Sequence, residues 1–446
     1  MDKETVIRLL SVAFLILYIV VWTVALVGTL TIYFRYSRTQ EHHGYISPPP
    51  SPPPRGVSIL RPMKGLDPQL EECLESAFRQ NYPKFEILLS VADGQDPAVE
   101  VAQRLIEKYP RISARLIIGT HSRPGETNAG AEDIGPNPKI NNLIKSYSEA
   151  KYDIIWILDA NTHVPSSTLS HSVERFLASA STPRPIQLVH HLPVCVINRP
   201  LETTNWGALL EETYLSTSHA KFYVSINKFG IAPCVMGKSN LFHKSSLDKA
   251  TAGEGLAKFA QYIAEDHLIA DTLWYHTPNP GPNHAMTRDI ARQPVQSESL
   301  ATYFERRIRW IRVRKYMVTS ATLIEPFTEC FLASIYGSFA LRTLFGYAWR
   351  KVVFWHVWIW LLVDLFQFHT LHSNSGESMQ DAETPEFARG SRPWTVRRLG
   401  LFFICWIIRE ATCLPIWIVA MFGRPIVNWR NRQFKVRRDM TVVELR

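Results

Sequence analysis

An uncharged apolar segment, Leu9–Phe34, is the feature that most constrains what this chain can fold into. It exceeds the roughly 20 apolar residues that a helix needs to cross a lipid bilayer. It is too long for the core of a signal peptide, and no small-residue cleavage site follows it. Arg35 and Arg38 follow the segment, whereas Asp2 and Glu4 precede it. The positive-inside rule therefore predicts a signal anchor that leaves the bulk of the chain in the cytosol.

The last third of the chain is also apolar. Val352–Val363 with its flanks and Leu399–Phe422 are the better candidates for further membrane spans. Glu325–Tyr347 is apolar but interrupted by Glu329 and Arg342, so we expect it to be interfacial or re-entrant. Arg409 and Glu410 lie inside the last apolar segment and should pair or face protein, because isolated charges are costly in lipid. Three crossings in total would return the C-terminus to the cytosol.

These segments divide the chain into five parts. We expect an anchor at 1–38, a proline-rich linker at 39–55, a cytosolic catalytic domain at 56–320 that includes an interfacial helix at 297–319, a membrane region at 321–423 and a basic cytosolic tail at 424–446. The run of prolines in the linker predicts a stiff polyproline spacer. A docking ligand for a proline-binding module is the alternative.

Charge and cysteine content exclude several classes of protein. The net charge is +9, and basic residues gather at 306–315 and 424–438, which indicates phosphates or an anionic membrane surface as partners. No nucleic-acid recognition motif accompanies these residues, so nucleic acid is not expected. The six cysteines lack the paired spacing of a zinc or redox site, and we expect reduced thiols. Nothing indicates an obligate protein partner.

Apolar strands and helical segments alternate from residue 56 to about 277, which predicts an α/β domain with a doubly wound, mostly parallel sheet. The expected strands are Val57–Leu60, Phe85–Val91, Ala114–Ile118 and Ile154–Leu158, and Leu70–Phe78 is an expected helix. In such sheets ligands bind beyond the carboxyl ends of the strands. Polar residues at those ends are therefore candidates for a binding site.

Four strand ends or helix starts carry suitable residues. Arg61, the pair Asp93 and Asp96, and Asp159 follow strands, and Lys139 opens a helix. Together they are typical of a nucleotide-diphosphate pocket, since a lysine at a helix N-terminus can meet phosphate oxygens. Each also has an ordinary structural role: Asp159 as a helix N-cap, Asp93 as a turn residue and Lys139 as a solvated lysine.

Asp159 and Asn161 place two oxygen-bearing side chains at alternate positions, which suits a hard divalent cation such as Mg²⁺ or Mn²⁺ that bridges phosphates. Cys234–Asn240 is a glycine-centred turn that resembles a phosphate loop only superficially, because the other glycines of that motif are absent. His190 lies near a strand, where a structural role is more common than a catalytic one.

Leu256–Tyr275 reads as one amphipathic helix with Glu265 and Asp266 inside it. A half-buried carboxylate with a raised pKa is what a general base for a hydroxyl group requires, and exposed helix charge is the alternative. Farther along, Arg306, Arg309 and Trp310 share one helical face and could hold a diphosphate leaving group. The alternative is a basic helix on the bilayer, with Arg307, Arg314 and Lys315 reaching headgroups.

The order of these motifs resembles that of the inverting membrane glycosyltransferases of the family 2 type, which have the GT-A fold. Within them the chain resembles the ceramide glucosyltransferase family, also classed as family 21, and its fungal members. The resemblance is carried by four stretches, Arg61–Pro68, Pro138–Leu143, Phe259–Asp266 and Arg306–Trp310. Asn161 stands where the usual metal motif has a second aspartate, and the 121–138 loop looks longer than in animal members.

This resemblance implies transfer of glucose from UDP-glucose to the primary hydroxyl of ceramide, with inversion, at the cytosolic face of Golgi-type membranes. It implies Asp266 as the base and Arg306, Arg309 and Trp310 at the leaving group and acceptor entrance. It also implies that the nucleotide sugar is bound by Arg61, Asp93, Asp96, Lys139, Asn141, Asp159, His190 and Glu265. The divalent cation would be bound by Asp159 and Asn161. A processive polysaccharide synthase, a polyprenyl-phosphate glycosyltransferase and an inactive binding protein are the alternatives.

Overall fold

The computed structural model describes residues 2–37, 54–119, 133–197, 205–296, 298–373, 384–389, 395–429 and 432–445. Nearly all of the expected linker at 39–55 and most of the 121–138 loop lie outside these ranges.

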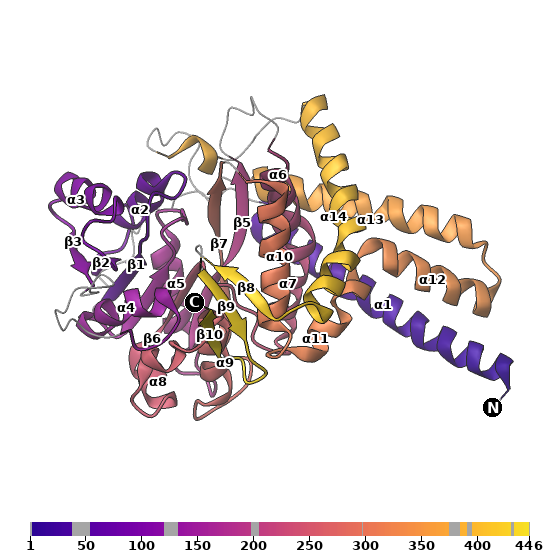
Figure 1. Ribbon diagram of the computed structural model, residues 1–446, viewed down its shortest axis with the longest axis horizontal. Coiled ribbons are helices and arrows are strands. Elements are labelled where there is room, and N and C mark those ends of the chain that lie inside the picture. Colours follow the sequence, from indigo (N-terminus) through magenta and orange to yellow (C-terminus); the bar gives the residue numbers. More distant parts are fainter. Residues whose placement is uncertain are drawn as a thin grey trace.

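The α/β domain is built on a seven-stranded sheet with the order β3-β2-β1-β4-β6-β5-β7 (Figure 1). Its pairs are parallel except where β6 runs antiparallel to β4 and β5. The mostly parallel α/β class expected from the sequence is confirmed. The strands are β1 Val57–Pro62, β2 Phe85–Val91, β3 Ser113–Ile118, β4 Ile154–Leu158, β5 Leu188–Ile197, β6 Ser239–His243 and β7 His284–Val295.

Helices cover both faces of the sheet because its strands are apolar on both sides. One hydrophobic core joins it to α2 Leu70–Phe78, α3 Ala98–Lys108 and α5 Thr168–Ser179. The other core joins it to α4 Pro138–Glu149, α8 Lys244–Ala250 and α9 Glu265–Tyr275. Trp156 in β4 is fully buried, as the unrelieved apolar run Ile154–Leu158 predicts.

A second helical layer separates the sheet from the apolar helices (Figure 1). It contains α6 Trp206–Tyr214, which continues through a π-helical turn, Leu215–His219, into α7 Ala220–Phe229. It also contains α10 Leu300–Arg314, followed by the short α11 Thr319–Ile324. The expected interfacial helix at 297–319 is therefore shorter than predicted.

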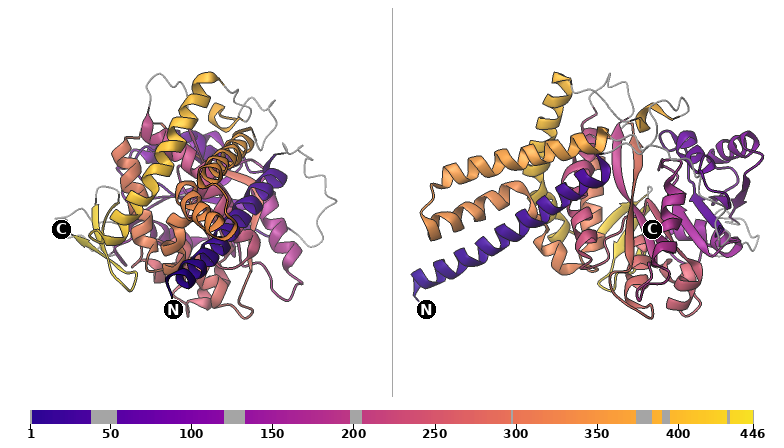
Figure 2. Two further views of the ribbon diagram at one scale, coloured as in Figure 1. Left: turned by 90° about the vertical axis from the view of Figure 1, so that its right-hand side faces the viewer. Right: turned by 180° about the vertical axis from the view of Figure 1, so that it is seen from behind.

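Three helices are long and apolar enough to cross a membrane: α1 Lys3–Tyr36, α13 Trp349–Ser373 and α14 Val396–Phe422. The chain is thus an integral membrane protein with the N-terminal and two C-terminal apolar helices that the sequence predicts. Between them, α12 Cys330–Phe345 is a shorter apolar helix that packs beside α1 and α13 (Figure 2). Its expected interfacial or re-entrant placement stays a prediction.

Two segments differ from the sequence expectation. Residues 256–275 do not form one helix: a 3-10 helix, Gly255–Phe259, ends before α9 begins at Glu265. The main-chain carbonyls of Ala260 and Tyr262 instead accept hydrogen bonds from Asn137, so the intervening residues leave helical geometry. The C-terminal tail folds as an antiparallel sheet of β8 Ile426–Trp429, β9 Arg432–Val436 and β10 Val442–Leu445.

Candidate active site

Asp159 follows β4 at the carboxyl edge of the sheet, as predicted. No helix begins there, because the next one, α5, starts at Thr168, so the N-cap alternative is wrong. The main-chain N–H of Asp159 donates to the carbonyl of Lys238, 3.0 Å away, which extends the antiparallel pairing of β4 with β6. This pairing brings a second, distant segment of the chain to Asp159.

Lys139 reaches Asp159 from the N-terminus of α4. Asn137 caps this helix by accepting from the N–H groups of Lys139 and Ile140 at 2.8 and 3.2 Å. The Lys139 Nζ lies 2.8 Å from Asp159 Oδ1 and 3.1 Å from Glu265 Oε1. Burial lowers the pKa of Lys139, but the three neighbouring carboxylates, with Asp159 the strongest, raise it above its ordinary value. The lysine is therefore a permanent cation, and the solvated-lysine alternative is wrong.

Lys238 supplies a second cation that the sequence reasoning missed. Its Nζ lies 3.3 Å from Asp159 Oδ2 and 3.1 Å from Asn161 Oδ1. The glycine-centred turn that carries it lacks phosphate-loop spacing, and only the pairing of β4 with β6 places it beside Asp159. Burial raises the pKa of Asp159, but Lys139 and Lys238 more than offset this and hold it below its ordinary value.

Glu265 and Asp266 open α9 on the other side of Lys139. Both oxygens of Glu265 are engaged, one by Lys139 and the other by the Asn137 Nδ2 at 3.0 Å. Among the described residues, no other side chain hydrogen-bonds to the carboxylate of Asp266, and only main-chain N–H groups at the start of α9 act on it as donors. Gly237 lies against it: a Cβ on this glycine would be 3.1 Å from the Asp266 Oδ2. Burial raises the pKa of both carboxyl groups.

A small cavity joins these groups. Its lining combines the charged residues with apolar side chains from the sheet and from two helices: Lys139, Leu143, Ile157, Gly237, Asn240, Phe242, Glu265, Asp266 and Ile269. Charged groups from four separate stretches of sequence therefore converge at the carboxyl edge of β4, and Asp159 and Asp266 lie on the same side of the domain.

The oxygens of Asp159 and Asn161 fit a hard divalent cation in kind, since Mg²⁺ is commonly held by one or two carboxylates together with substrate phosphates. In this structure both side chains bind the ammonium group of Lys238. Within the described residues, no cluster of three or more His, Cys, Asp or Glu side chains suits a metal. A cation here would take most of its ligands from water and phosphate.

The structure corrects the expectation for Arg61. Its side chain is fully buried, and its guanidinium donates to the carbonyls of Cys73, Ala160 and Thr162 at 2.8 to 3.3 Å. It cannot contact a nucleotide in this state. Instead it holds the turn that follows Asp159, because it binds the carbonyl oxygens on either side of Asn161.

His190 is likewise a core residue, as the structural alternative predicts. It is fully buried, with its Nδ1 2.5 Å from the Tyr223 hydroxyl, and burial holds its pKa well below the ordinary value. It belongs to strand β5, which runs from Leu188 to Ile197. Asn141 is also buried and donates to the carbonyl of Gly135 at 2.8 Å, so it supports the loop before α4.

Asp93 and Asp96 have different surroundings. Asp96 accepts from the main-chain N–H groups of Gly65 and Ala98, each at 2.9 Å, and so ties the turn after β1 to the start of α3. Asp93 is exposed, and one of its oxygens accepts from the N–H of Gln95 at 2.9 Å. Asp93 is therefore the better placed of the two to meet a ligand.

The three residues of the arginine–tryptophan motif diverge. Arg306 forms ion pairs with Glu211, at 3.1 Å, and with Glu298. Arg309 donates to the carbonyl of Asn428 at 3.1 Å. Trp310 packs into a cluster that Met236, the residue before Gly237, also contacts. Trp310 thus shares a hydrophobic cluster with the residue that precedes Gly237.

The alternative in which a basic helix lies on the bilayer required Arg307, Arg314 and Lys315 to reach lipid headgroups. In the structure these three side chains are engaged within the protein. Arg307 is buried, with its guanidinium carbon 3.5 Å from the centre of the Tyr214 ring. Arg314 pairs with Glu325, and Lys315 is buried and donates to the carbonyl of Met421 at 3.3 Å.

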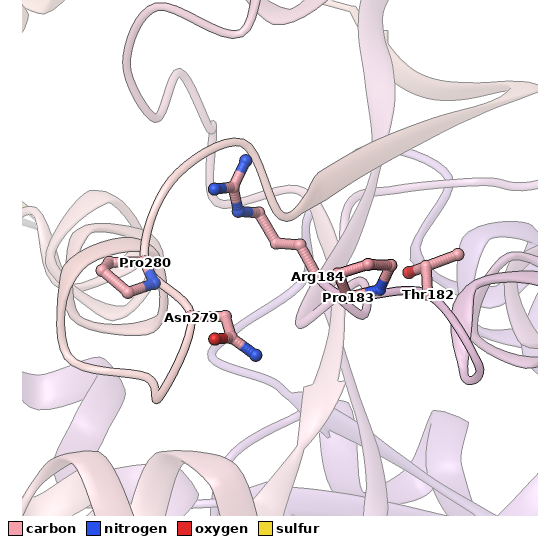
Figure 3. Close-up of a pocket in the computed structure, with 5 residues that line it drawn as sticks. All are labelled: Thr182, Pro183, Arg184, Asn279 and Pro280. Carbon is pink, nitrogen blue, oxygen red and sulfur yellow. The ribbon is translucent and has the colours of Figure 1, made fainter.

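A separate surface hollow lies at the opposite edge of the sheet (Figure 3). It is lined by Thr182, Pro183 and Arg184 in the loop before β5 and by Asn279 and Pro280 in the turn before β7. Both strands run parallel to β4 in the sheet, so this hollow is at their amino ends. It is not part of the site around Asp159.

Sequence comparison matches residues 20–442 to the family described as glycosyl transferase family 21. A ceramide glucosyltransferase of Komagataella phaffii is 40% identical and covers 98% of this chain and 92% of its own. Those of Candida albicans (33%; 97% and 97%) and Pyricularia oryzae (35%; 96% and 93%) are similar along nearly the whole chain.

Two solved structures show more distant likeness. The mannosyltransferase PcManGT from Pyrobaculum calidifontis, in complex with GDP-Man and Mn²⁺, is 17% identical with a TM-score of 0.40 and covers 81% of this chain and 98% of its own. S. aureus TarS 1–349, in complex with UDP-GlcNAc, is 11% identical with a TM-score of 0.33 and covers 87% and 96%.

Proposed function

We propose, from the premise that this chain belongs to glycosyl transferase family 21 and is a ceramide glucosyltransferase, that its donor is UDP-glucose and that Asp266 is the general base. The observation that carries this proposal is the contrast between the two adjacent carboxylates. Glu265 is held by Lys139 and Asn137, whereas Asp266 lies beside the cavity and, among the described residues, no other side chain hydrogen-bonds to its carboxylate.

The reaction then proceeds in one displacement. The Asp266 carboxylate takes the proton of the ceramide primary hydroxyl while that oxygen attacks the anomeric carbon of glucose. The bond from this carbon to the diphosphate breaks, and UDP leaves from the opposite face. Attack opposite the leaving group inverts the anomeric centre and gives a β-glucoside. A raised pKa suits this base, because a carboxyl group with an ordinary pKa is a weak proton acceptor.

Lys139 and Lys238 offset the negative charge that develops on the leaving diphosphate. Both ammonium groups flank Asp159, so they already stand at one edge of the site before substrate binds. Lys139, held between Asp159 and Glu265, is a fixed cation of the kind that stabilises a transition state without reorganisation. Asp159 orients the two lysines, and Asp93 is the candidate for contact with the nucleoside. Arg309 and Trp310 border the acceptor side, which is supported by the shared packing of Trp310 with Met236.

A divalent cation is part of this proposal. Asp159 and Asn161 would hold it together with diphosphate oxygens, and the Lys238 ammonium group would move from these side chains to a phosphate. Such an ion supplies Lewis-acid stabilisation of the leaving group.

The acceptor determines where the reaction takes place. Ceramide chains leave the bilayer at a cost of about 0.8 kcal/mol per CH₂, so the hydroxyl must reach Asp266 from the membrane surface. The layer of α6, α7 and α10 that joins the domain to the apolar helices supports this arrangement (Figure 1). We place the catalytic domain on the cytosolic face of a Golgi membrane, in accord with Arg35 in the last turn of α1.

The test is transfer of labelled glucose from UDP-glucose to a short-chain ceramide by Asp266→Asn, Glu265→Gln and Asp271→Asn. We expect Asp266→Asn to lose about 100-fold to 10,000-fold in rate, which is the usual contribution of a general base. Asp271→Asn, in the same helix but outside the cavity lining, should retain the wild-type rate. Label that still appears on ceramide at the normal rate with Asp266→Asn would contradict the assignment of the base.

A further inference from the structure

The C-terminal sheet, β8 to β10, contacts both α10 and the segment that leads into Glu265 and Asp266. Its core consists of Val427, Phe434, Val436 and Val442, which are nearly fully buried. Three partly buried residues from outside the sheet pack against this core: Ile263 before α9, Val313 in α10, and Tyr316 just beyond α10. One small sheet therefore touches two parts of the proposed active site that are distant in sequence.

On the α10 side, the contacts are hydrogen bonds from arginines to main-chain carbonyls of β8. Arg309 donates to Asn428 at 3.1 Å, and Arg312 donates to Ile426 at 2.7 Å. Figure 1 shows β8 beside α10. Main-chain carbonyls move only with their strand, so the position of the Arg309 guanidinium depends on where the sheet lies.

On the α9 side, the contact is between main chains. The N–H of Val442 in β10 donates to the carbonyl of Gln261 at 3.0 Å. Gln261 lies four residues before Glu265, in the segment that is not helical. Asn137 holds the opposite flank of this segment through the carbonyls of Ala260 and Tyr262. The approach to Asp266 is thus fixed between α4 and the C-terminal sheet.

We propose that the C-terminal sheet is a positioning element that sets Asp266 relative to Arg309. This inference rests on the proposed function, in which Asp266 is the base and Arg309 borders the acceptor side. A tail without such a role would be expected to pack on one element. The C-terminal sheet instead binds both α10, which carries Arg309, and the segment that leads into Asp266. It does so through its own main-chain groups, whose geometry is rigid.

Val442 offers a selective test on the full-length protein. In the antiparallel ladder of β9 and β10, hydrogen-bonded residue pairs alternate with pairs that are not hydrogen-bonded. Arg437 and Thr441 form a hydrogen-bonded pair, so the next pair, Val436 and Val442, is not hydrogen-bonded. The N–H of Val442 therefore points away from β9 and donates to Gln261. Val442→Pro therefore removes the link to Gln261 while keeping the sheet's own bonds. Val442→Ala is the matched control, since it also shortens the buried side chain but retains the N–H.

We expect Val442→Pro to lower kcat about tenfold or more relative to Val442→Ala, because small misplacements of catalytic groups are costly. The KM for UDP-glucose should stay within about twofold, because Lys139 at the start of α4 and Asp159 after β4 are held by each other and by these elements. Faster hydrogen exchange at residues 261–268, with unchanged exchange in β1 to β4, should accompany the loss. Equal kcat values for the two variants would overturn the proposal.

If Val442→Pro does not fold, Ile263→Ala tests the same contact from the other side. Its control is Val443→Ala, which shortens an exposed side chain of β10. Ile263→Ala should lower kcat with little change in KM, and Val443→Ala should change neither. A wild-type kcat in Ile263→Ala would contradict the positioning role of the C-terminal sheet. Normal activity of Asp266→Asn would instead contradict the proposed function.

Discussion

At the scale of single residues, neighbouring carboxylates acquire different roles from their surroundings. Glu265 and Asp266 are adjacent in sequence, yet only Glu265 is held by both Lys139 and Asn137. Asp266 instead faces Gly237 and the cavity. A structural carboxylate and a candidate base thus stand side by side at the start of α9.

The pH dependence of the rate should report the surroundings of Asp266. Burial raises its pKa above the ordinary value of 3.8, the Asp159 charge adds to this, and Lys139 opposes it. A base acts in its deprotonated form, so kcat should rise with pH through the raised pKa and level off above it. Single-turnover rates across acidic pH, with recovery at neutral pH as the control, measure this limb. A midpoint at or below 3.8, the ordinary value of aspartate, would contradict the assignment.

Gly237→Ala should reduce turnover without unfolding the protein. The added Cβ would meet the Cβ and Oδ2 of Asp266, each at 3.1 Å, which is tighter than ordinary packing allows. Asp266 must then shift by a few tenths of an ångström, and we expect a loss of roughly tenfold in kcat. Gly400→Ala, where nothing lies within 4 Å of the new atom, is the control. An unchanged kcat with an unchanged thermal midpoint would show that this contact does not position the base.

At the scale of elements, a close contact at Gly28 helps to dock helix α1 on the catalytic domain. At Gly28, α1 approaches α7 so nearly that a Cβ would lie 2.2 Å from the carbonyl oxygen of Lys221. The Ser225 hydroxyl donates to the carbonyl of Val24 at 2.5 Å in the same region. Small residues allow helices in membranes to approach in this way.

Gly28→Ala should separate these two helices and destabilise the protein. Overpacking of this kind costs about 1–3 kcal/mol. The yield of monodisperse protein after detergent extraction and its thermal midpoint measure the effect. Leu26→Ala, at an exposed position of α1, should leave both unchanged. Equal stability of the two variants would mean that α1 is not held at Gly28.

At the scale of the whole molecule, a buried network of charges joins the apolar helices to the catalytic domain. Lys221 of α7 lies 2.6 Å from Asp364 of α13, and Arg409 of α14 lies 3.1 Å from the same carboxylate. Arg409 also pairs with Glu410, so the prediction that these two charges pair is confirmed. The Trp406 indole donates to Asp364 at 2.7 Å.

Lys221→Met should weaken this junction strongly. Removing one partner of a buried ion pair leaves an uncompensated charge, which typically costs about 3–5 kcal/mol. We expect a lower yield of folded protein and a lower thermal midpoint. Lys228→Met, at an exposed position of the same helix, is the control. If Lys221→Met is as stable as this control, the network does not contribute to the docking of the apolar helices.

Local pattern predicted much of the fold. The unrelieved apolar run Ile154–Leu158 and the periodic segment Leu70–Phe78 form the strand and helix that their sequences indicate, with those bounds. The predicted 256–275 helix is wrong, because bonds from Asn137 draw the main chain of 260–262 away from helical geometry. The sequence predicts that Arg61 follows a strand that ends at Leu60, but β1 extends to Pro62 and includes it, and burial and three main-chain carbonyls make it a support rather than a ligand contact.

The amino-acid sequence by itself determined the α/β class, the three apolar helices and the positions of Asp159 and Lys139 near strand or helix ends. These features depend on hydrophobic periodicity and on local backbone geometry, which neighbouring residues set. Only the tertiary structure decided that Lys238 lies beside Asp159, that His190 is buried and that the tail forms a sheet against α10. The physical reason is that the antiparallel pairing of β4 with β6 and the packing of the tail join residues far apart in the chain, and such contacts leave no periodic trace in sequence.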